Sequence, residues 1–263
     1  MATKPKVLIL GTGPSAAFAV QACKDLGINP YVWGEKPPHF TQAGAFFIHH
    51  LPESLQAGAV PMKVRISRRG NADSYSVKQW GRILHTSFPD KEYTADWYSS
   101  VELARVWNGV HIDVKKLNDV ELLSYGGLFD WIFHTFPLEC HSQHRVCGSI
   151  PCLVGVPYND LGPRVLYSGS LKDDWIRLTD SMGRRTLEFP GYSPNSTIRD
   201  EVNFSLFRGT VREIRLRDLG PRQQPVPVPE YLSSNIIPVG RWACWDHKML
   251  SHDTYERVRS YLE

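Results

Sequence analysis

A short turn near the amino terminus could bind phosphate: it reads G-x-G-x-x-A and comprises Gly11, Gly13, Pro14, Ser15 and Ala16. The first glycine permits a tight turn, and the second lets a pyrophosphate approach the backbone. The small third residue allows a helix to pack closely on the preceding strand, and the start of that helix offers free N–H groups. The pattern predicts dinucleotide binding, with a glycine turn in an unrelated α/β protein as the alternative.

The elements around this turn favour the nucleotide interpretation. Residues 7–10 form an apolar run typical of a buried strand of a parallel sheet, and residues 16–26 predict a helix that ends at Gly27. Residues 30–33 predict a second strand, which completes a βαβ unit of the expected size. The turn therefore stands between a strand and a helix, as a dinucleotide fingerprint requires.

A residue that binds the ribose is expected at the end of the second strand, where an acidic side chain can accept from the hydroxyls. Gly34 stands at that place, so the candidate is Glu35, one position later. A solvated turn residue is the alternative for Glu35. We also expect Lys36 and Gly44, in the loop that follows, to contact the cofactor.

The carboxy terminus contains a second cofactor signal. Residues 235–239 predict a last strand, which Gly240 and Arg241 close before a terminal helix over residues 251–262. Here the chain resembles the FAD-binding glutathione-reductase-type superfamily, specifically its amine oxidase and UDP-galactopyranose mutase branch. In that branch a late strand also ends in Gly-Arg. The resemblance implies that FAD is the cofactor and that Gly240, Arg241 and Trp242 approach it.

A narrower resemblance is to small FAD-dependent proteins encoded by bacteriophages. It rests on the stretch Gly-Ala-Phe-Phe-Ile-His at 44–49, on Tyr167-x-Gly169 and on Trp175-x-Arg177. Some of these proteins resemble enzymes of thymine hypermodification. That implies an amino-acid adduct on thymine in phage DNA as the substrate and the cytoplasm of the host as the location.

Few side chains are needed for catalysis, because a flavin carries the hydride chemistry itself. His49, or its neighbour His50, could be the base that takes a proton from an ammonium or a Cα–H group. Arg177 could bind a carboxylate or a phosphate with its planar fork. Tyr167 and Trp245 could complete a substrate site with aromatic walls. The alternatives are a hydrogen-bonded loop histidine and a solvated arginine at a sheet edge.

The segment CHSQHRVCGSIPC at 140–152 concentrates possible metal ligands. Its candidates, with His141 as a substitute, are Cys140, His144, Cys147 and Cys152. Their spacing matches none of the familiar paired zinc motifs, and free cysteine is a common core residue near strands. We predict no metal here; a zinc site or a thiol acting near the flavin are the alternatives.

A basic strand over residues 210–217 is expected to carry alternating arginines on one face, which could contact a DNA backbone; they are Arg212, Arg215 and Arg217, together with Arg222. Glu213 and Asp218 interrupt its charge, so a solvated strand face is the favoured interpretation.

The bulk composition excludes several classes of protein. With 42% hydrophobic residues in 263, the chain is not disordered, and a net charge of +3 gives no global basic field. No apolar run reaches membrane-spanning length, and the apolar stretch at the amino terminus is too short for a signal peptide. We therefore expect a soluble, cytoplasmic protein without a membrane partner. Five cysteines, an odd number, predict free thiols.

These observations predict an α/β fold with a Rossmann-like FAD-binding domain and an inserted antiparallel β-sheet domain for the substrate. We assign residues 1–65, 108–145 and 230–263 to the first domain and residues 66–107 and 146–229 to the second. The favoured function is a flavoenzyme that oxidises an amine or amino-acid-like group or cleaves its C–N bond, on a small molecule or a nucleotide. A non-redox flavoprotein of the sugar-mutase type and a non-catalytic nucleotide-binding protein are the alternatives.

Overall fold

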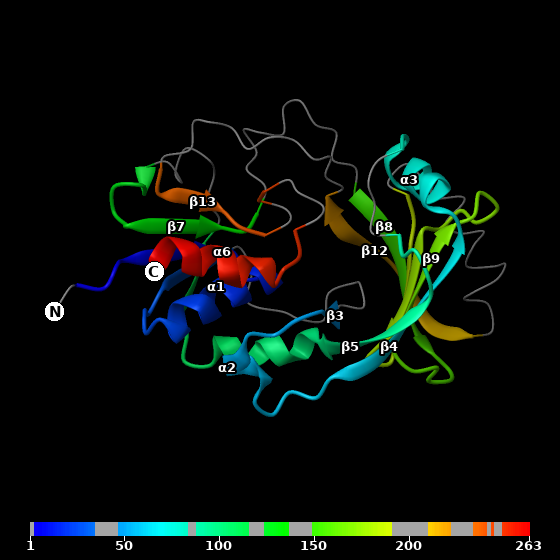
Figure 1. Ribbon diagram of the computed structural model, residues 1–263, viewed down its shortest axis with the longest axis horizontal. Coiled ribbons are helices and arrows are strands. Elements are labelled where there is room, and N and C mark those ends of the chain that lie inside the picture. Colours follow the sequence, from blue (N-terminus) through cyan, green and yellow to red (C-terminus); the bar gives the residue numbers. More distant parts are fainter. Residues whose placement is uncertain are drawn as a thin grey trace.

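The fold contains two sheets, which lie toward opposite ends of the molecule (Figure 1). The computed structural model describes residues 3–34, 47–83, 88–115, 124–136, 149–190, 210–221, 234–240, 243–244 and 249–263. The first sheet is parallel and has the strand order β13-β7-β1-β2-β6. Its strands are β1 (Val7–Leu10), β2 (Tyr31–Gly34), β6 (Ile112–Val114), β7 (Trp131–His134) and β13 (Ile236–Pro238). The predicted strands at residues 7–10, 30–33 and 235–239 correspond to β1, β2 and β13.

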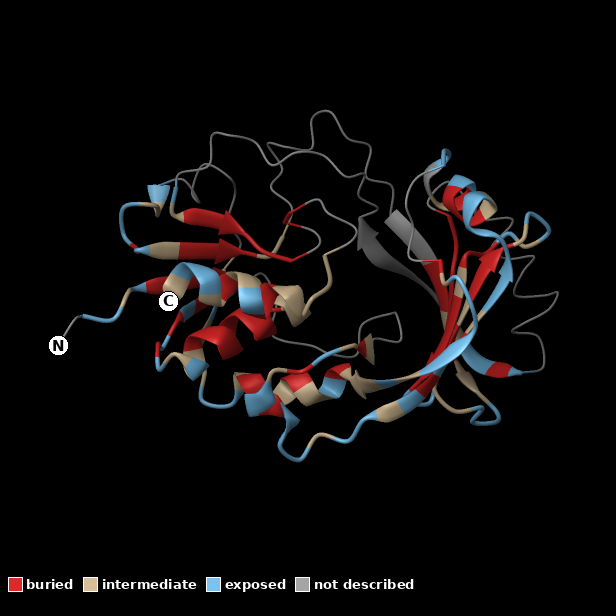
Figure 2. Cartoon of the chain, in the orientation of Figure 1, coloured by how far each residue is buried: buried red, intermediate tan, exposed pale blue. Residues whose placement is uncertain are grey.

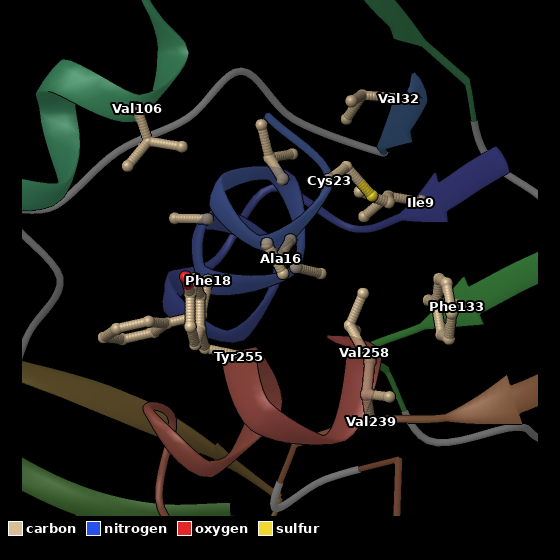
Figure 3. Close-up of a cluster of buried hydrophobic side chains, with 14 of the residues drawn as sticks. Ile9, Ala16, Phe18, Cys23, Val32, Val106, Phe133, Val239, Tyr255 and Val258 are labelled. Atoms are coloured by element: carbon tan, nitrogen blue, oxygen red, sulfur yellow. The ribbon is translucent and has the colours of Figure 1, made fainter. Parts of the chain in front are cut away.

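Two helices from opposite ends of the chain pack on this sheet. They are α1 (Pro14–Asp25) and α6 (Asp253–Leu262). Figure 3 shows Phe18 of α1 beside Tyr255 of α6, and Val258 of α6 on the side of Phe133 of β7; these residues belong to one buried cluster. β1 is buried along its whole length, because Val7 and Ile9 join this cluster and its other two residues join a second one. The first and last helices of the chain therefore pack together against the parallel sheet.

The second sheet has eight strands in the order β12-β8-β11-β10-β9-β4-β5-β3. They are β3 (Phe47–Ile48), β4 (Met62–Gly70), β5 (Tyr93–Ser99), β8 (Ser149–Pro157), β9 (Arg164–Gly169), β10 (Arg177–Ser181), β11 (Arg184–Glu188) and β12 (Val211–Pro221). The expected antiparallel pairing holds for each described pair except β4 with β9, which run parallel. A long connection separates these two strands in the sequence, and only such a connection can bring strands together in parallel. The sheet is therefore mixed.

The structure contains helices that the sequence did not predict. They are α2 (Glu53–Gln56), α3 (Ala72–Trp80) and the 3₁₀ helix η1 (Ser100–Trp107). The caps of α3 are visible in the sequence: Asn71 accepts from the Ser74 N–H, and Gly81 ends the helix at a φ of 73°. The residues between these caps lack a clear apolar stripe, which explains why the pattern did not predict the helix.

The boundaries proposed for the two domains stay a prediction. Buried residues concentrate within the parallel sheet and its helices and along the eight-stranded sheet (Figure 2). Along the described residues, no helix has both the length and the apolar character needed to cross a membrane.

A buried lysine ties α3 to the eight-stranded sheet. The Lys78 side chain is 6% exposed, and its Nζ donates to the carbonyl oxygens of Ser168 (3.3 Å), Ser170 (3.0 Å) and Trp175 (2.5 Å). These carbonyls flank the connection between β9 and β10. The ammonium group therefore fixes the approach to the strand that carries Arg177.

We expect Lys78→Met to lower the free energy of unfolding by about 2–4 kcal/mol, because several buried carbonyls lose a charged donor. Chemical denaturation would measure the change. The exposed Lys91 supplies a control, since Lys91→Met should change stability by less than about 0.5 kcal/mol. Equal stability of the two variants would contradict the assigned role of Lys78.

Candidate functional site

The glycine turn begins at Gly11, whose backbone only glycine adopts readily. Its φ is 118°, and its N–H donates to the carbonyl of Trp33 at 2.7 Å. A Cβ at this position would lie 2.0 Å from Oγ1 of Thr135, which donates to the carbonyl of Leu10. Gly11 therefore lies where the carboxyl ends of β1, β2 and β7 meet, at one edge of the parallel sheet.

Gly13 stands at the start of α1 with open space beside it. Within the described residues, no atom lies within 4 Å of the position that a Cβ on Gly13 would take. The Gly13 carbonyl accepts the N–H of Ala17 at 3.0 Å. The N–H groups of Ser15 and Ala16 come before this first intrahelical hydrogen bond and are not used by the helix, and Pro14 has no N–H group. The first turn of α1 contains no acidic residue. The turn therefore presents amides and a positive helix end to an open space, which suits a phosphate group.

The late strand approaches the same turn from the other end of the chain. Gly240 has a φ of 84°, and a Cβ there would lie 2.4 Å from Oγ of Ser15 and 3.5 Å from Oγ1 of Thr254. Its carbonyl accepts the N–H of Cys244 at 3.0 Å. The structure therefore brings Gly11, Gly13, Ser15 and Gly240 together. Arg241, Trp242 and Trp245 lie outside the described residues.

A physical reason explains the glycine where the ribose-binding acid was expected. A Cβ on Gly34 would lie 2.5 Å from Cγ2 of Thr12, so the side chain of the fingerprint threonine fills that space. Any larger residue at the end of β2 would displace the turn. Glu35, Lys36 and Gly44 lie outside the described residues, and their contacts with a cofactor stay predictions.

His49 follows β3 and stacks on an aromatic side chain. Its ring lies 4.1 Å from the ring of Trp97 at an interplanar angle of 20°, and 5.9 Å from the ring of His252. The ring of His50 lies 5.0 Å from that of His252. Burial and the neighbouring His50 lower the pKa of His252, while Asp253 opposes this shift.

The rings of His49 and His50 lie beside His252, which stands at the start of α6. The same end of α6 lies near Gly240, which approaches Ser15 of the glycine turn. His252 precedes Thr254, which is the residue that approaches Gly240. A titratable side chain therefore lies where α6 leads toward the phosphate-binding turn. The sequence indicated His49 and His50, but it missed His252 and Trp97, which come from distant segments.

Tyr167 and Arg177 are direct neighbours on β9 and β10. Arg177 donates to Glu188 of β11 from both Nε and Nη2, each at 2.8 Å. The Glu188 side chain is 6% exposed and that of Arg177 is 33% exposed. Burial opposes the charge on Arg177, but Glu188, Tyr167 and Tyr75 raise its pKa above the ordinary value, so it stays charged. A role in substrate binding stays a prediction, and it would require the guanidinium to share its charge with Glu188.

The hairpin turn between β10 and β11 could have revealed Glu188. Met182 and Gly183 have φ angles of 50° and 67°, which is the backbone of a two-residue type I′ turn. Such a turn fixes the register, and counting outward from it pairs Arg177 with Glu188. The sequence signal is a glycine between two strand-like runs.

Strand register places the candidate substrate residues on one face of the sheet. On β9, Tyr167 and Val165 point to the same side, and Val165 lies opposite Ile66 of β4. Ile66 lies opposite Tyr93 of β5, and Tyr93 and Trp97 point to the same side of that strand. We call this the inner face, defined by Trp97, Tyr167 and Arg177. The sheet curls, since Oγ of Ser99 lies 2.8 Å from Sδ of Met182 across two strands. His49 stacks on Trp97 and so adjoins this face.

We expect Arg177→Ala to lower the free energy of unfolding by about 2–3 kcal/mol, because a buried Glu188 carboxylate loses its partner. The double variant Arg177→Met/Glu188→Gln removes both charges and should recover most of this loss. If Arg177 also binds a substrate anion, the double variant should still lose about 2–4 kcal/mol of transition-state stabilisation in kcat/KM while keeping its cofactor. An unchanged kcat/KM would exclude the substrate role.

The metal candidates are only partly visible. Cys152 lies in β8 opposite Glu188. Like Cys23 and Cys244, it is buried and forms no disulfide within the described residues. Burial raises the pKa of the Cys23 thiol to about 12. Cys140, His144 and Cys147 lie outside the described residues, and within the described ones no three His, Cys, Asp or Glu side chains form a group that could hold a metal ion. The absence of a metal stays a prediction.

Comparison with known proteins identifies the fold. No known family model and no curated protein sequence matches the chain. Among solved structures, it is similar to reduced UDP-galactopyranose mutase (12% identity, 98% of this chain and 95% of that one, TM-score 0.62). It is also similar to 2,6-dihydroxypyridine-3-hydroxylase from Arthrobacter nicotinovorans (10% identity, 100% of this chain and 84% of that one, TM-score 0.55). A third similar structure is an FAD-dependent oxidoreductase from Pseudomonas aeruginosa (10% identity, 100% of this chain and 91% of that one, TM-score 0.50). The α/β fold with a Rossmann-like parallel sheet, predicted from the sequence, is confirmed.

Proposed function

We propose that the chain is an FAD-dependent flavoenzyme that holds the pyrophosphate of FAD at the start of α1. The observation that carries this proposal is the junction of Gly11, Gly13 and Gly240 around an open space at the helix start. The same fold occurs in an oxidoreductase described as FAD-dependent, which supports this cofactor.

The residues of the junction have separate roles in this proposal. The amides of Ser15 and Ala16 donate to the phosphates, and the glycine at position 13 leaves them room. Gly240 allows the segment after β13 to approach the same group. When bound, FAD supplies the acceptor of a hydride.

The substrate that the site suits best is an amine or an amino-acid-like group, which the enzyme oxidises or cleaves at its C–N bond. His49 is the candidate for the base that removes a proton, and its stacking on Trp97 fixes the ring plane. The aromatic residues of the inner face suit a substrate carried on a flat ring. An amino-acid adduct on thymine in phage DNA, processed in the host cytoplasm, is the specific form that we propose.

A non-redox reaction of the sugar-mutase type is the second candidate. The similarity to UDP-galactopyranose mutase extends over nearly the whole of both chains, which supports it. In such a reaction substrate and product have the same oxidation state, so no electrons remain on the cofactor.

Anaerobic mixing of the flavin-loaded protein with candidate amines tests the proposal. Net oxidation should bleach the flavin absorbance in proportion to the amine consumed. Turnover with full retention of the oxidised spectrum would instead favour the non-redox candidate. If the protein binds no flavin and converts neither amines nor nucleotide sugars, both candidate functions are wrong.

A further inference from the structure

A β-bulge in the edge strand β12 changes the direction of its arginines. Arg212 lies opposite Val156 of β8 and Arg215 lies opposite Val154, so two residues of β12, at 213 and 214, face one of β8. Glu213 has a φ of 55°, a left-handed backbone that non-glycine residues rarely adopt. The bulge therefore puts two arginines three positions apart onto the same face, which regular alternation would not do.

That face is the inner face. Val154 shares its side of β8 with Cys152, which lies opposite Glu188, and Glu188 lies opposite Arg177. Arg212 and Arg215 thus point to the same side of the sheet as the candidate substrate residues. β12 is the edge of the sheet beside β8 (Figure 1).

Both arginines are available to a ligand. They are exposed, and neither side chain forms an ion pair or a hydrogen bond with another residue in the described part of the chain. Their partners on β8 are two residues apart, which sets the two charges about 7 Å apart along the strand. That distance spans about two steps of a stacked nucleic acid strand, which carries one phosphate every 3.4 Å or so.

We propose that Arg212 and Arg215 form a track on the inner face for the phosphodiester backbone of a nucleic acid strand. A row of separated charges suits a chain of phosphates better than a single phosphate, which needs donors that converge on one point. The exposed carboxylate of Glu213 opposes the attraction, but the bulge that it occupies is what orients the arginines.

This inference names the kind of molecule that carries the substrate, and its link to catalysis rests on the proposed function. Binding is measured without turnover, so the two can fail separately. A protein without flavin activity can still bind the strand, and a flavoenzyme for small amines would not bind it.

The test is fluorescence anisotropy with a labelled single-stranded DNA oligonucleotide over a series of salt concentrations. We expect Arg212→Gln/Arg215→Gln to reduce the slope of log K against log salt by about 1.4, since each phosphate contact contributes about 0.7. The matched control is Arg65→Gln, which removes an exposed arginine that lies opposite Arg164, on the other face of the same sheet. It should leave the slope unchanged.

A second variant tests the bulge. Glu213→Gly keeps the left-handed backbone and removes the opposing charge, so it should bind the strand more tightly than the parent protein. Several results would overturn the proposal: no binding at low salt, an equal loss for Arg65→Gln, weaker binding of Glu213→Gly, or displacement of the strand by UDP or inorganic phosphate at equal phosphate concentration. Displacement of that kind would indicate a site for a small anion.

Discussion

Gly13→Val is expected to fold normally and to purify without flavin. The Cβ of a residue at this position meets no atom of the described part of the chain within 4 Å, so the new side chain enters the space that we assign to the pyrophosphate. Losing two charge-assisted hydrogen bonds to phosphate should raise the Kd for FAD about 10²–10⁴-fold. Flavin content after reconstitution and the thermal unfolding midpoint of the free protein measure the two effects.

Gly11→Ala is the matched control, because it perturbs the fold and not only the ligand space. Its Cβ would lie 2.0 Å from Oγ1 of Thr135, and its φ of 118° is unfavourable for alanine. This variant should be destabilised even without cofactor. Full flavin occupancy in Gly13→Val would contradict the assignment of the pyrophosphate site.

His49→Ala is expected to slow the reduction of bound flavin by substrate about 10²–10⁴-fold, the usual contribution of a general base. The ring is held by stacking on Trp97, and FAD binding should persist because the glycine turn is untouched. Stopped-flow absorbance under anaerobic conditions gives the rate. His50→Ala, which removes the adjacent histidine, is the control and should retain most of the rate. A larger loss for His50→Ala than for His49→Ala would transfer the role of base to the neighbour.

The βαβ unit could be predicted from the sequence because its signals are local. A buried strand, a glycine turn and a helix ended by Gly27 follow one another within about thirty residues, the length of such a unit. The glycine at the end of β2 was not expected, because the reason for Gly34 is a contact with Thr12 on another segment.

The candidate substrate face was predicted less well, since it depends on contacts between distant strands. His49 meets Trp97 and His252 only after β3 pairs with β5 and α6 packs on α1. Regular alternation along β12 breaks at the bulge, where Glu213 adds a residue that no local pattern announces. The helix α3 was missed for the opposite reason: its caps were local, but they were outweighed by its lack of an apolar stripe.

The most direct test of the account is the visible absorbance spectrum of the purified protein, followed by identification of any pigment released on denaturation. The account predicts the two visible bands of oxidised flavin, about one flavin per chain after incubation with FAD, and release of intact FAD and not FMN. A protein that stays colourless after incubation with FAD, while folded by thermal unfolding, would contradict the central claim that the junction of Gly11, Gly13 and Gly240 is a flavin site.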